Sequence, residues 1–437
     1  MKHQILVSLF VFGISFCGYS QIGFDPKFKA KEAIFLLKSG KYETVCSRMD
    51  PLMKRILDEE KLMGFWDVLE MCNGQIIEVS EPAIATKDKL AIAVSIIQYE
   101  KKKVGLKIVF NEKGEIAGLF LVSPTPQYQH PDYVNPNTFY EFKKILPDPN
   151  FPLEGVLTIP KKGDKFPIVI IVGDAGAIDK DYSIGPNKIY KDLAWGLADN
   201  GIAVYRYDKR NYAYPKELIS KKIFTPDDEY LIDLKNAIKQ VKKVPEIDSN
   251  QIIILGHGLG AYLIPYFQKS IPNIHAFISF NGNFSHLPEL LVQQNSYLMS
   301  KLPEPQKQEA KWTLQKANNA IKGVTLFNKS DSLPYGFPLS YWTFLKENGP
   351  VNYVSEVVYQ RILFLQCNRD FQVPVSELEQ WRLLSQNYAI RNWTFSSFPK
   401  LNHLGLEGEG LSLPAEYLKP NNIPYELILR IAGFVLY

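Results

Sequence analysis

Short runs of uninterrupted apolar residues recur between residues 138 and 437, and they constrain the fold more than any other feature. Examples are PIVIIV at residues 167–172 and QIIIL at residues 251–255. Helical stretches such as Lys188–Asp199 and Asp228–Lys243 lie between such runs. Strands without polar residues are typical of a parallel sheet that is buried on both faces, since helices cover each face. This part of the chain is therefore predicted to form an α/β domain with a doubly wound, mostly parallel sheet.

The predicted strands of this domain are Gly155–Ile159, Ile168–Val172, Ala203–Tyr207, Ile252–Leu255, Ala276–Phe280, Ile362–Gln366 and Trp393–Ser397. The interval between the fifth and sixth strands is too long for one crossover helix, so we predict a helical cap over about residues 284–355. Ligands of such sheets bind at the carboxyl ends of the strands, where a cap shapes a pocket.

Residues 24–125 show a different order of elements, which predicts a separate α+β domain. Two helical stretches come first, at residues 28–49, with a break at Gly40, and at residues 50–72. The predicted strands that follow are Gln75–Val79, Leu90–Gln98, Val104–Asn111 and Ile116–Leu121. Repeated prolines then disfavour regular structure at residues 126–137, which we predict to be the linker between the domains.

The amino terminus has the features of an export signal. A basic start, MKH, precedes an apolar stretch at Ile5–Phe16, and small or polar residues at 18–20 offer a cleavage site. We therefore expect residues 1–20 to be a signal peptide and the mature chain to be secreted or periplasmic. The stretch is shorter than the about 20 residues that span a bilayer, so no membrane span is expected. A lipid anchor on Cys17 is disfavoured because a large residue, Phe16, precedes it.

Composition narrows the classes of partner. The chain has 50 Lys and Arg residues against 46 Asp and Glu residues, a net charge of +4 that is too small for a nucleic-acid-binding surface. Beyond the signal, Cys46, Cys72 and Cys367 remain, and a pairing of Cys46 with Cys72 stays open. The sequence has no HExxH, no CxxC and no zinc-type spacing, so neither a metal nor another cofactor is implied.

The sequence GHGLG at residues 256–260 follows the run QIIIL. It resembles the nucleophile elbow, G-x-S-x-G, of the α/β-hydrolase family, whose glycines let strand and helix approach closely. LFLQCNRDFQVPVSELEQW resembles the acid segment of that family and implies Asp370 as the acid. FPKLNHLGLEGEG resembles its histidine loop and implies His403 as the base. IYKDLAWGLADNGIAVYRYDKR and PAEYLKPNNIP resemble secreted bacterial esterases and serine-aminopeptidase-like members. The resemblance covers residues 138–437 and implies an α/β-hydrolase fold of the ester or amide hydrolase class.

Two positions depart from the pattern of this family. Gly258 stands where the family has its nucleophilic serine. The loop after the second predicted strand is GDAGA at residues 173–177, where the family has H-G-S-G-P. By position, the resemblance implies the backbone N–H groups of Ala175 and Leu259 as the donors of an oxyanion hole. We expect the negative charge of Asp174 to oppose an oxyanion there.

Within residues 24–125, the segments LLKSGKYE and KGEIAGLFLVSP and the residue Trp66 resemble a domain of unknown function that often precedes secreted bacterial hydrolases. This resemblance implies a fold like the α+β cone of the nuclear-transport-factor superfamily. This part of the sequence shows no catalytic constellation.

Three functions remain open. The first is a secreted pseudo-hydrolase, in which Gly258 ends serine catalysis and a capped pocket binds a small-molecule acyl ester or a short peptide. The second is an active ester or amide hydrolase, in which His403 activates a water in the space that the missing hydroxyl leaves. The third is an interaction protein led by the N-terminal domain. Cys367, Ser279 and Ser285 are not expected to replace the serine, because the oxyanion donors are directed at the elbow.

Overall fold

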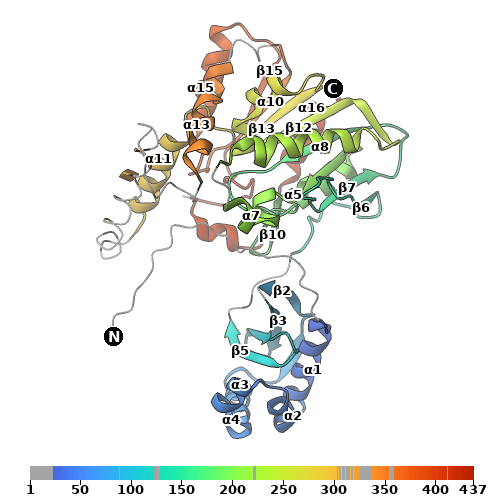
Figure 1. Cartoon of the computed structure of the whole chain (residues 1–437), viewed down its shortest axis with the longest axis vertical. Helices are drawn as coiled ribbons and strands as arrows, with labels where there is room; N and C mark the ends of the chain where they lie inside the picture. Colours follow the sequence, from blue (N-terminus) through green and yellow to red (C-terminus); the bar gives the residue numbers. More distant parts are fainter. Residues whose placement is uncertain are drawn as a thin grey trace. The chain divides into compact units, whose positions relative to one another are not determined.

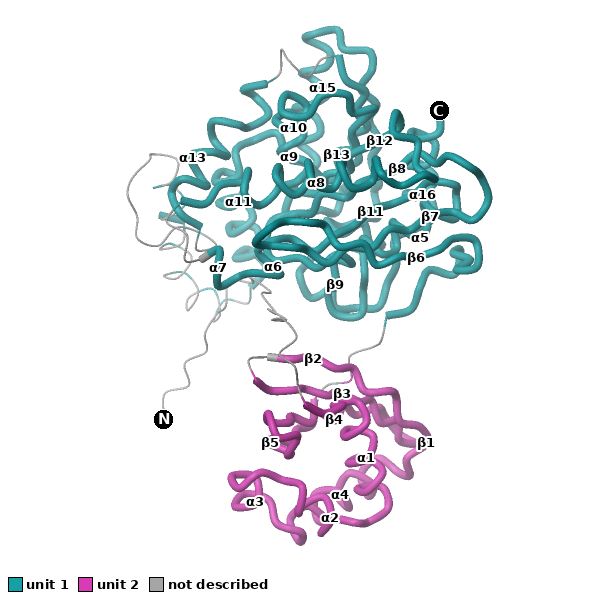
Figure 2. The backbone as a smooth tube through the Cα atoms, turned by 45° about the vertical axis from the view of Figure 1, so that its right-hand side comes forward, with its two compact units in different colours: residues 1–13, 128–437 teal, residues 14–127 magenta. Residues whose placement is uncertain are grey.

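The computed structural model describes residues 23–437, except positions 88, 123, 125–127, 220–222, 354–358 and 411 and most of the stretch 303–336. The chain forms two compact units that divide between residues 127 and 128 (Figure 2). The predicted signal peptide lies outside the described residues.

An eight-stranded sheet organises the larger unit (Figure 1). In spatial order its strands are β15 (Trp393–Phe398), β14 (Ile362–Cys367), β13 (Ala276–Phe280), β12 (Ile247–His257), β8 (Phe166–Val172), β11 (Ala203–Tyr207), β7 (Gly155–Pro160) and β6 (Phe139–Lys143). The strands from β15 to β11 are parallel, and β7 runs antiparallel to both of its neighbours. The predicted fold class, a mostly parallel α/β sheet with a separate α+β domain, is therefore confirmed.

The other elements of the larger unit connect these strands. They are β9 (Ser183–Ile184), β10 (Asn187–Lys188), α5 (Ile189–Asp199), α6 (Arg210–Ala213), α7 (Pro215–Ile219), the π-helical turn η1 (Asp227–Leu231), α8 (Ile232–Val241), α9 (Leu259–Tyr262), α10 (Ile264–Ser270), α11 (Leu287–Ser300), α13 (Leu339–Glu347), η3 (Pro350–Tyr353), α15 (Val375–Asn387), η4 (Pro414–Leu418) and α16 (Tyr425–Leu436).

Alternate residues of the central strands pack into two different cores. On β8, Ile168 and Ile170 belong to a core that includes residues of α8, α10 and α15. Val169 and Ile171 belong to a second core, which includes residues of α5 and α16. All seven residues of β8 are buried, which explains why the strand carries no polar side chain.

Every strand predicted for this unit is present, whereas β6 and the two-residue strands β9 and β10 were not predicted. The sequence of β6, FYEFK, mixes aromatic and charged residues, and Phe139 is its one buried residue. This composition suits an edge strand with a single neighbour, and it lacks the apolar run that marks the central strands.

Residues 128–137, predicted to belong to the linker, lie on the larger unit. The hydroxyl of Tyr128 donates to Asp192 Oδ1 at 2.7 Å, and that of Tyr133 donates to the carbonyl of Ile423 at 2.7 Å. Val134 is buried in a small cluster with Phe139. These contacts fasten the segment to α5 and to the chain that precedes α16.

The interval between β13 and β14 contains α11, α13 and η3 among its described residues. Because most of the stretch 303–336 lies outside the description, a cap over residues 284–355 stays a prediction. Within the part of the chain that is described, no helix is long and apolar enough to cross a membrane.

The smaller unit places helices against an antiparallel sheet. Its elements are α1 (Pro26–Lys38), α2 (Tyr42–Ser47), α3 (Pro51–Ile56), α4 (Glu59–Asn73), β1 (Ile76–Val79), β2 (Ala83–Lys87), β3 (Leu90–Tyr99), β4 (Lys103–Phe110) and β5 (Ile116–Val122). The strand order is β1-β3-β4-β5, with β2 also paired to β3. The first predicted helical stretch divides at the predicted Gly40 break, where Gly40 adopts a φ of 68°. The second stretch, predicted as one, divides into α3 and α4, and β2 was not predicted. Cys46 and Cys72 are free thiols, so the pairing that the sequence left open is not formed.

Candidate active site

The predicted elbow is a sharp turn between β12 and α9. Gly258 occupies this turn with a φ of 51°, a backbone conformation that residues other than glycine rarely adopt. A Cβ atom on Gly256 would lie 2.4 Å from the carbonyl oxygen of Gly260. A Cβ atom on Gly260 would lie 2.5 Å from the carbonyl oxygen of Val172. The two flanking glycines are therefore required by the close approach of helix and strand.

The carboxylate of Asp174 fills the space above Gly258. A Cβ atom on Gly258 would lie 1.9 Å from Asp174 Oδ1 and 2.3 Å from its Cγ. The same Oδ1 accepts hydrogen bonds from the backbone N–H groups of Ala175, at 2.6 Å, and Leu259, at 2.8 Å. These are the two donors that the sequence resemblance implied for an oxyanion hole. The sequence predicted that the charge of Asp174 would oppose a substrate oxyanion. In the structure the Asp174 carboxylate itself occupies the position of that oxyanion.

His403 lies between two carboxylates. Its Nδ1 lies 2.6 Å from Asp370 Oδ2, and its Nε2 lies 2.9 Å from Asp174 Oδ2. Asp370 follows β14, and its Oδ1 accepts from the N–H groups of Gln372 and Val373, which orients its Oδ2 toward the imidazole. The structure therefore brings Asp370, His403 and the elbow together, with the Asp174 carboxylate where a serine hydroxyl would stand.

Asp370, His403 and Asp174 form a row of buried side chains whose charges stabilise one another. Burial lowers the pKa of His403, but the charges of Asp370 and Asp174 and their hydrogen bonds outweigh it and raise that pKa to about 10. Burial raises the pKa of Asp174, but the hydrogen bond and charge of His403, with the Leu259 N–H, hold that pKa well below its usual range. At neutral pH the row is therefore an imidazolium between two carboxylates.

His257, the second residue of the elbow motif, is buried against His403. The two rings stack with their centroids 4.8 Å apart. Its Nε2 lies 2.9 Å from the carbonyl oxygen of His403, and its Nδ1 lies 3.2 Å from the hydroxyl of Tyr190. Burial, reinforced by the positive charge of His403, lowers the pKa of His257 to about 4, so this ring is neutral at pH 7.

Asp174, His257 and His403 are also the residues that come nearest to a metal-binding arrangement in the described chain. Each offers one ligand atom, and these atoms lie within 4.8 Å of one another. However, the four ring nitrogens all have hydrogen-bond partners, and His403 already lies between two carboxylates. The sequence showed no metal spacing because the three residues come from distant segments, namely the loop after β8, the end of β12 and the loop after β15.

Three side chains hold the backbone of Asp174. Its N–H donates to the hydroxyl of Tyr190 at 3.1 Å, and its carbonyl oxygen accepts from Lys209 Nζ and, at 3.0 Å, from the hydroxyl of Tyr230. Lys209 also forms a buried ion pair of 2.8 Å with Glu229. Glu229 and Tyr230 lie on the π-helical turn η1, a form of helix that is frequent at functional sites. Sequence reasoning missed these residues, because no spacing marks them.

The residues considered as substitute nucleophiles lie in other surroundings. Cys367 is fully buried, and burial raises the pKa of its thiol well above the usual range. The hydroxyl of Ser285 donates to Glu377 Oε1 at 2.9 Å. Ser279 is buried on β13.

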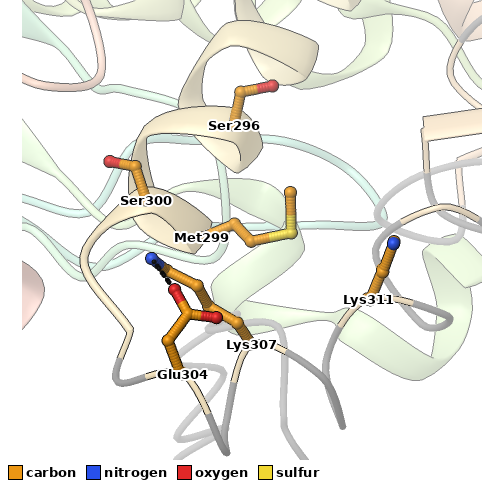
Figure 3. A pocket seen from close by; sticks show the side chains of 6 residues that line it. All are labelled: Ser296, Met299, Ser300, Glu304, Lys307 and Lys311. Atoms are coloured by element: carbon orange, nitrogen blue, oxygen red, sulfur yellow. Dashed lines mark hydrogen bonds and ion pairs between the residues drawn. The ribbon is translucent and has the colours of Figure 1, made fainter.

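Two pockets among the described residues lie away from this row. One, of about 310 Å³, is shown in Figure 3 and is lined by Ser296, Met299, Ser300, Glu304, Lys307 and Lys311. Its Lys307 and Glu304 form an ion pair of 2.9 Å. The other, of about 540 Å³, is lined by Arg369, Pro399, Lys400, Glu407, Gly408, Glu409 and Gly410. Neither contains Asp174 or His403.

Comparison with known proteins covers both units. Residues 30–119 match the family model described as a protein of unknown function, DUF3887. The chain is 28% identical over 446 residues to Esterase EstD of Thermotoga maritima, and the match covers 100% of both chains. The crystal structure of an esterase of Pyrococcus furiosus aligns with 71% of this chain and 96% of its own, at 15% identity and a TM-score of 0.43. A puromycin-hydrolyzing peptidase of Mycobacterium tuberculosis aligns with 82% of this chain and 47% of its own, at 14% identity and a TM-score of 0.44. The full-length similarity to an esterase, together with the sheet topology, confirms the predicted resemblance to the α/β-hydrolase family and the presence of an N-terminal domain of unknown function.

Proposed function

We propose that this chain is an exported α/β-hydrolase-fold protein of the esterase or peptidase type that does not perform serine acyl transfer. It is therefore a pseudo-hydrolase, a protein with the fold of the esterases that it resembles but without their serine chemistry. The observation that carries this proposal is the position of the Asp174 carboxylate. It takes the volume above Gly258 in which a nucleophilic hydroxyl would stand, and it occupies both N–H donors that a substrate oxyanion would need.

The geometry favours this function over an ester hydrolase that uses water activated by His403. A general base must accept a proton, whereas His403 holds one on each ring nitrogen at neutral pH, since its pKa is raised to about 10. Its Nε2 also bonds to Asp174 Oδ2 and not to open space. A water in the space of the missing hydroxyl would compete with the Asp174 carboxylate for that space.

The ligand class and the export of the chain remain part of this proposal. The ligand we propose is a small-molecule acyl ester or a short peptide, held under the predicted cap without contact to the two N–H donors. Export rests on the signal-like sequence at residues 1–20. Sequencing the amino terminus of protein recovered from the periplasm or medium tests the export, because cleavage near residue 20 would expose a new terminus. An interaction role for the N-terminal domain stays a prediction.

Two reagents test the loss of serine chemistry on the full-length mature chain. A fluorophosphonate probe labels activated serines, and p-nitrophenyl acyl esters report acyl transfer. We expect no covalent labelling, and ester turnover no faster than that of the His403→Ala variant. Labelling of the chain, or ester turnover that His403→Ala abolishes, would refute the proposal.

A further inference from the structure

The strand β6 forms one edge of the eight-stranded sheet and has a single neighbour, β7 (Figure 1). Four of its five residues are exposed. Tyr140 and Phe142 are 54% and 49% exposed, and the centroids of their rings lie 5.9 Å apart. Edge strands usually carry features that discourage pairing with another chain, whereas this one presents two adjacent aromatic rings. It is therefore a candidate surface for a partner strand.

The opposite edge of the sheet, β15, is less accessible. Ser397 is the one exposed residue of that strand. Its neighbour Ser396 accepts a hydrogen bond from Arg430 of α16 at 2.6 Å. Of the two edges, β6 is the one at which a further strand could pair.

The hydrogen-bond ladder determines which main-chain groups of β6 face this edge. The N–H of Lys144 donates to the carbonyl oxygen of Gly155 at 2.8 Å. Because hydrogen-bonded pairs alternate in an antiparallel ladder, Phe142, two residues earlier, also bonds to β7. The N–H and C=O groups of Glu141 and Lys143 therefore point away from β7, toward the open edge.

The charges at this edge are complementary under a two-fold rotation. If two copies of β6 pair antiparallel with Phe142 on the axis, Glu141 of each copy lies opposite Lys143 of the other. Pairing centred on Glu141 or on Lys143 would instead bring like charges opposite each other, which is unfavourable. Pairing centred on Tyr140 would place Glu141 opposite Phe139. Charge complementarity thus selects the register with Phe142 on the axis.

Glu141 is already held in place for such a pair. Its Oε1 accepts from Arg206 Nη2 at 2.8 Å and from the hydroxyl of Thr158 at 3.1 Å. Both bonds use the same oxygen, so Oε2 can accept from Lys143 of a second copy. The Glu141 side chain is 27% exposed, which leaves room for that approach.

We propose that this chain forms a reversible two-fold dimer in which β6 pairs antiparallel with β6 of a second copy. The two eight-stranded sheets then continue into one another, and the two Phe142 rings form a cross-strand aromatic pair on the axis. An interface built on one five-residue strand is small, and small interfaces give reversible association. The proposal concerns assembly, goes beyond the proposed function and uses no residue of the elbow or of the row.

Sedimentation velocity of the mature chain, residues 21–437, tests the association. The expected result is a mass that rises with protein concentration from that of one chain toward that of two. Phe142→Lys should keep the mass of one chain, because two lysines would then face each other on the axis. The matched control is Phe120→Lys on β5, a phenylalanine with 52% exposure, which should associate as the unmodified chain does.

Variants of Lys143 test the charge pairing. Lys143→Glu should abolish association, since it would lie opposite Glu141, whereas Lys143→Arg should preserve it. The mass of one chain at every concentration up to the solubility limit would overturn the proposal. A dimer that persists in both Phe142→Lys and Lys143→Glu would also overturn it, because another surface would then form the interface.

Disulfide formation tests the register. All variants carry Cys72→Ser, which removes the exposed native thiol. The two Cα atoms at position 142 should lie about 4.5 Å apart, so Phe142→Cys should oxidise to a covalent dimer. In the matched control, Tyr140→Cys, the two Cα atoms at position 140 should lie about 14 Å apart, too far for a disulfide. As much covalent dimer from Tyr140→Cys as from Phe142→Cys would overturn the proposed pairing.

Discussion

Restoring a serine at the elbow is expected to disrupt the site unless Asp174 is removed at the same time. In Gly258→Ser the new Cβ would lie 1.9 Å from Asp174 Oδ1, far inside any contact distance, so the carboxylate must leave its position. It would lose the N–H donors of Ala175 and Leu259 and its pairing with His403. Breaking a buried ion pair costs about 3–5 kcal/mol. At roughly 2 °C for each kcal/mol in a unit of this size, the Tm should fall by about 6–10 °C.

The double variant Asp174→Gly/Gly258→Ser should recover part of that loss, because the clash and the displaced carboxylate are both removed, although His403 keeps only Asp370 as its partner. A serine at a φ of 51° still carries backbone strain of about 1–3 kcal/mol, so recovery will be incomplete. The two substitutions should therefore couple by about 1–3 kcal/mol in a double-mutant cycle measured by urea unfolding. The double variant also places a hydroxyl near His403 with both oxyanion donors open, so labelling by the fluorophosphonate probe is expected.

The matched control is Gly433→Ser on α16, where an added Cβ meets nothing within 4 Å. Its Tm should stay within about 2 °C of the unmodified chain. If Gly258→Ser is as stable as this control, the carboxylate does not occupy the elbow and the reasoning fails. Equal destabilisation in the single and double variants would also refute it, because the clash would then not be the cause.

Three further outcomes are expected. Lys209→Met should lower the free energy of unfolding by about 3–5 kcal/mol, because it leaves the buried carboxylate of Glu229 without its ion-pair partner, and a loss below 1 kcal/mol in urea would contradict this. His403 binds its proton more tightly in the folded than in the unfolded chain, so its stabilising contribution is complete below about pH 6.5 and is lost as the pH rises through about 10. Urea unfolding at several pH values checks this, and a His403→Gln variant that loses as much stability over that range would speak against it. The thiol of Cys72 is exposed and that of Cys367 buried, so a maleimide should modify Cys72 in the folded chain and Cys367 after unfolding, whereas equal rates in the folded state would contradict the structure.

Local sequence patterns were sufficient for most of the fold. Runs such as PIVIIV specify buried strands because every position faces apolar side chains, whatever the neighbouring strand is. The strands that escaped prediction, β2, β6, β9 and β10, are short and have polar or mixed compositions. Their pairing depends on the strand beside them, which a local pattern does not contain.

The candidate site divides in the same way. The resemblance to the α/β-hydrolase motifs implied Gly258, Asp370 and His403 as one site, and each of them follows a strand at the carboxyl edge of the sheet. The same sequence located Asp174 in the loop after β8 but did not indicate where its carboxylate points. That direction depends on the Leu259 N–H and on His403, which bind the carboxylate from segments distant in the sequence.

The sequence by itself therefore determined the layered α/β architecture, the separate N-terminal unit and the absence of a serine at the elbow. Only the tertiary structure decided that a carboxylate fills the vacant volume and the oxyanion hole and that His403 is shared between two acids. The physical reason is the distance along the chain over which each property is specified. Burial and turn geometry are specified by residues near one another in the chain. The position of a buried charge is decided by donors and counter-charges that folding gathers from distant segments.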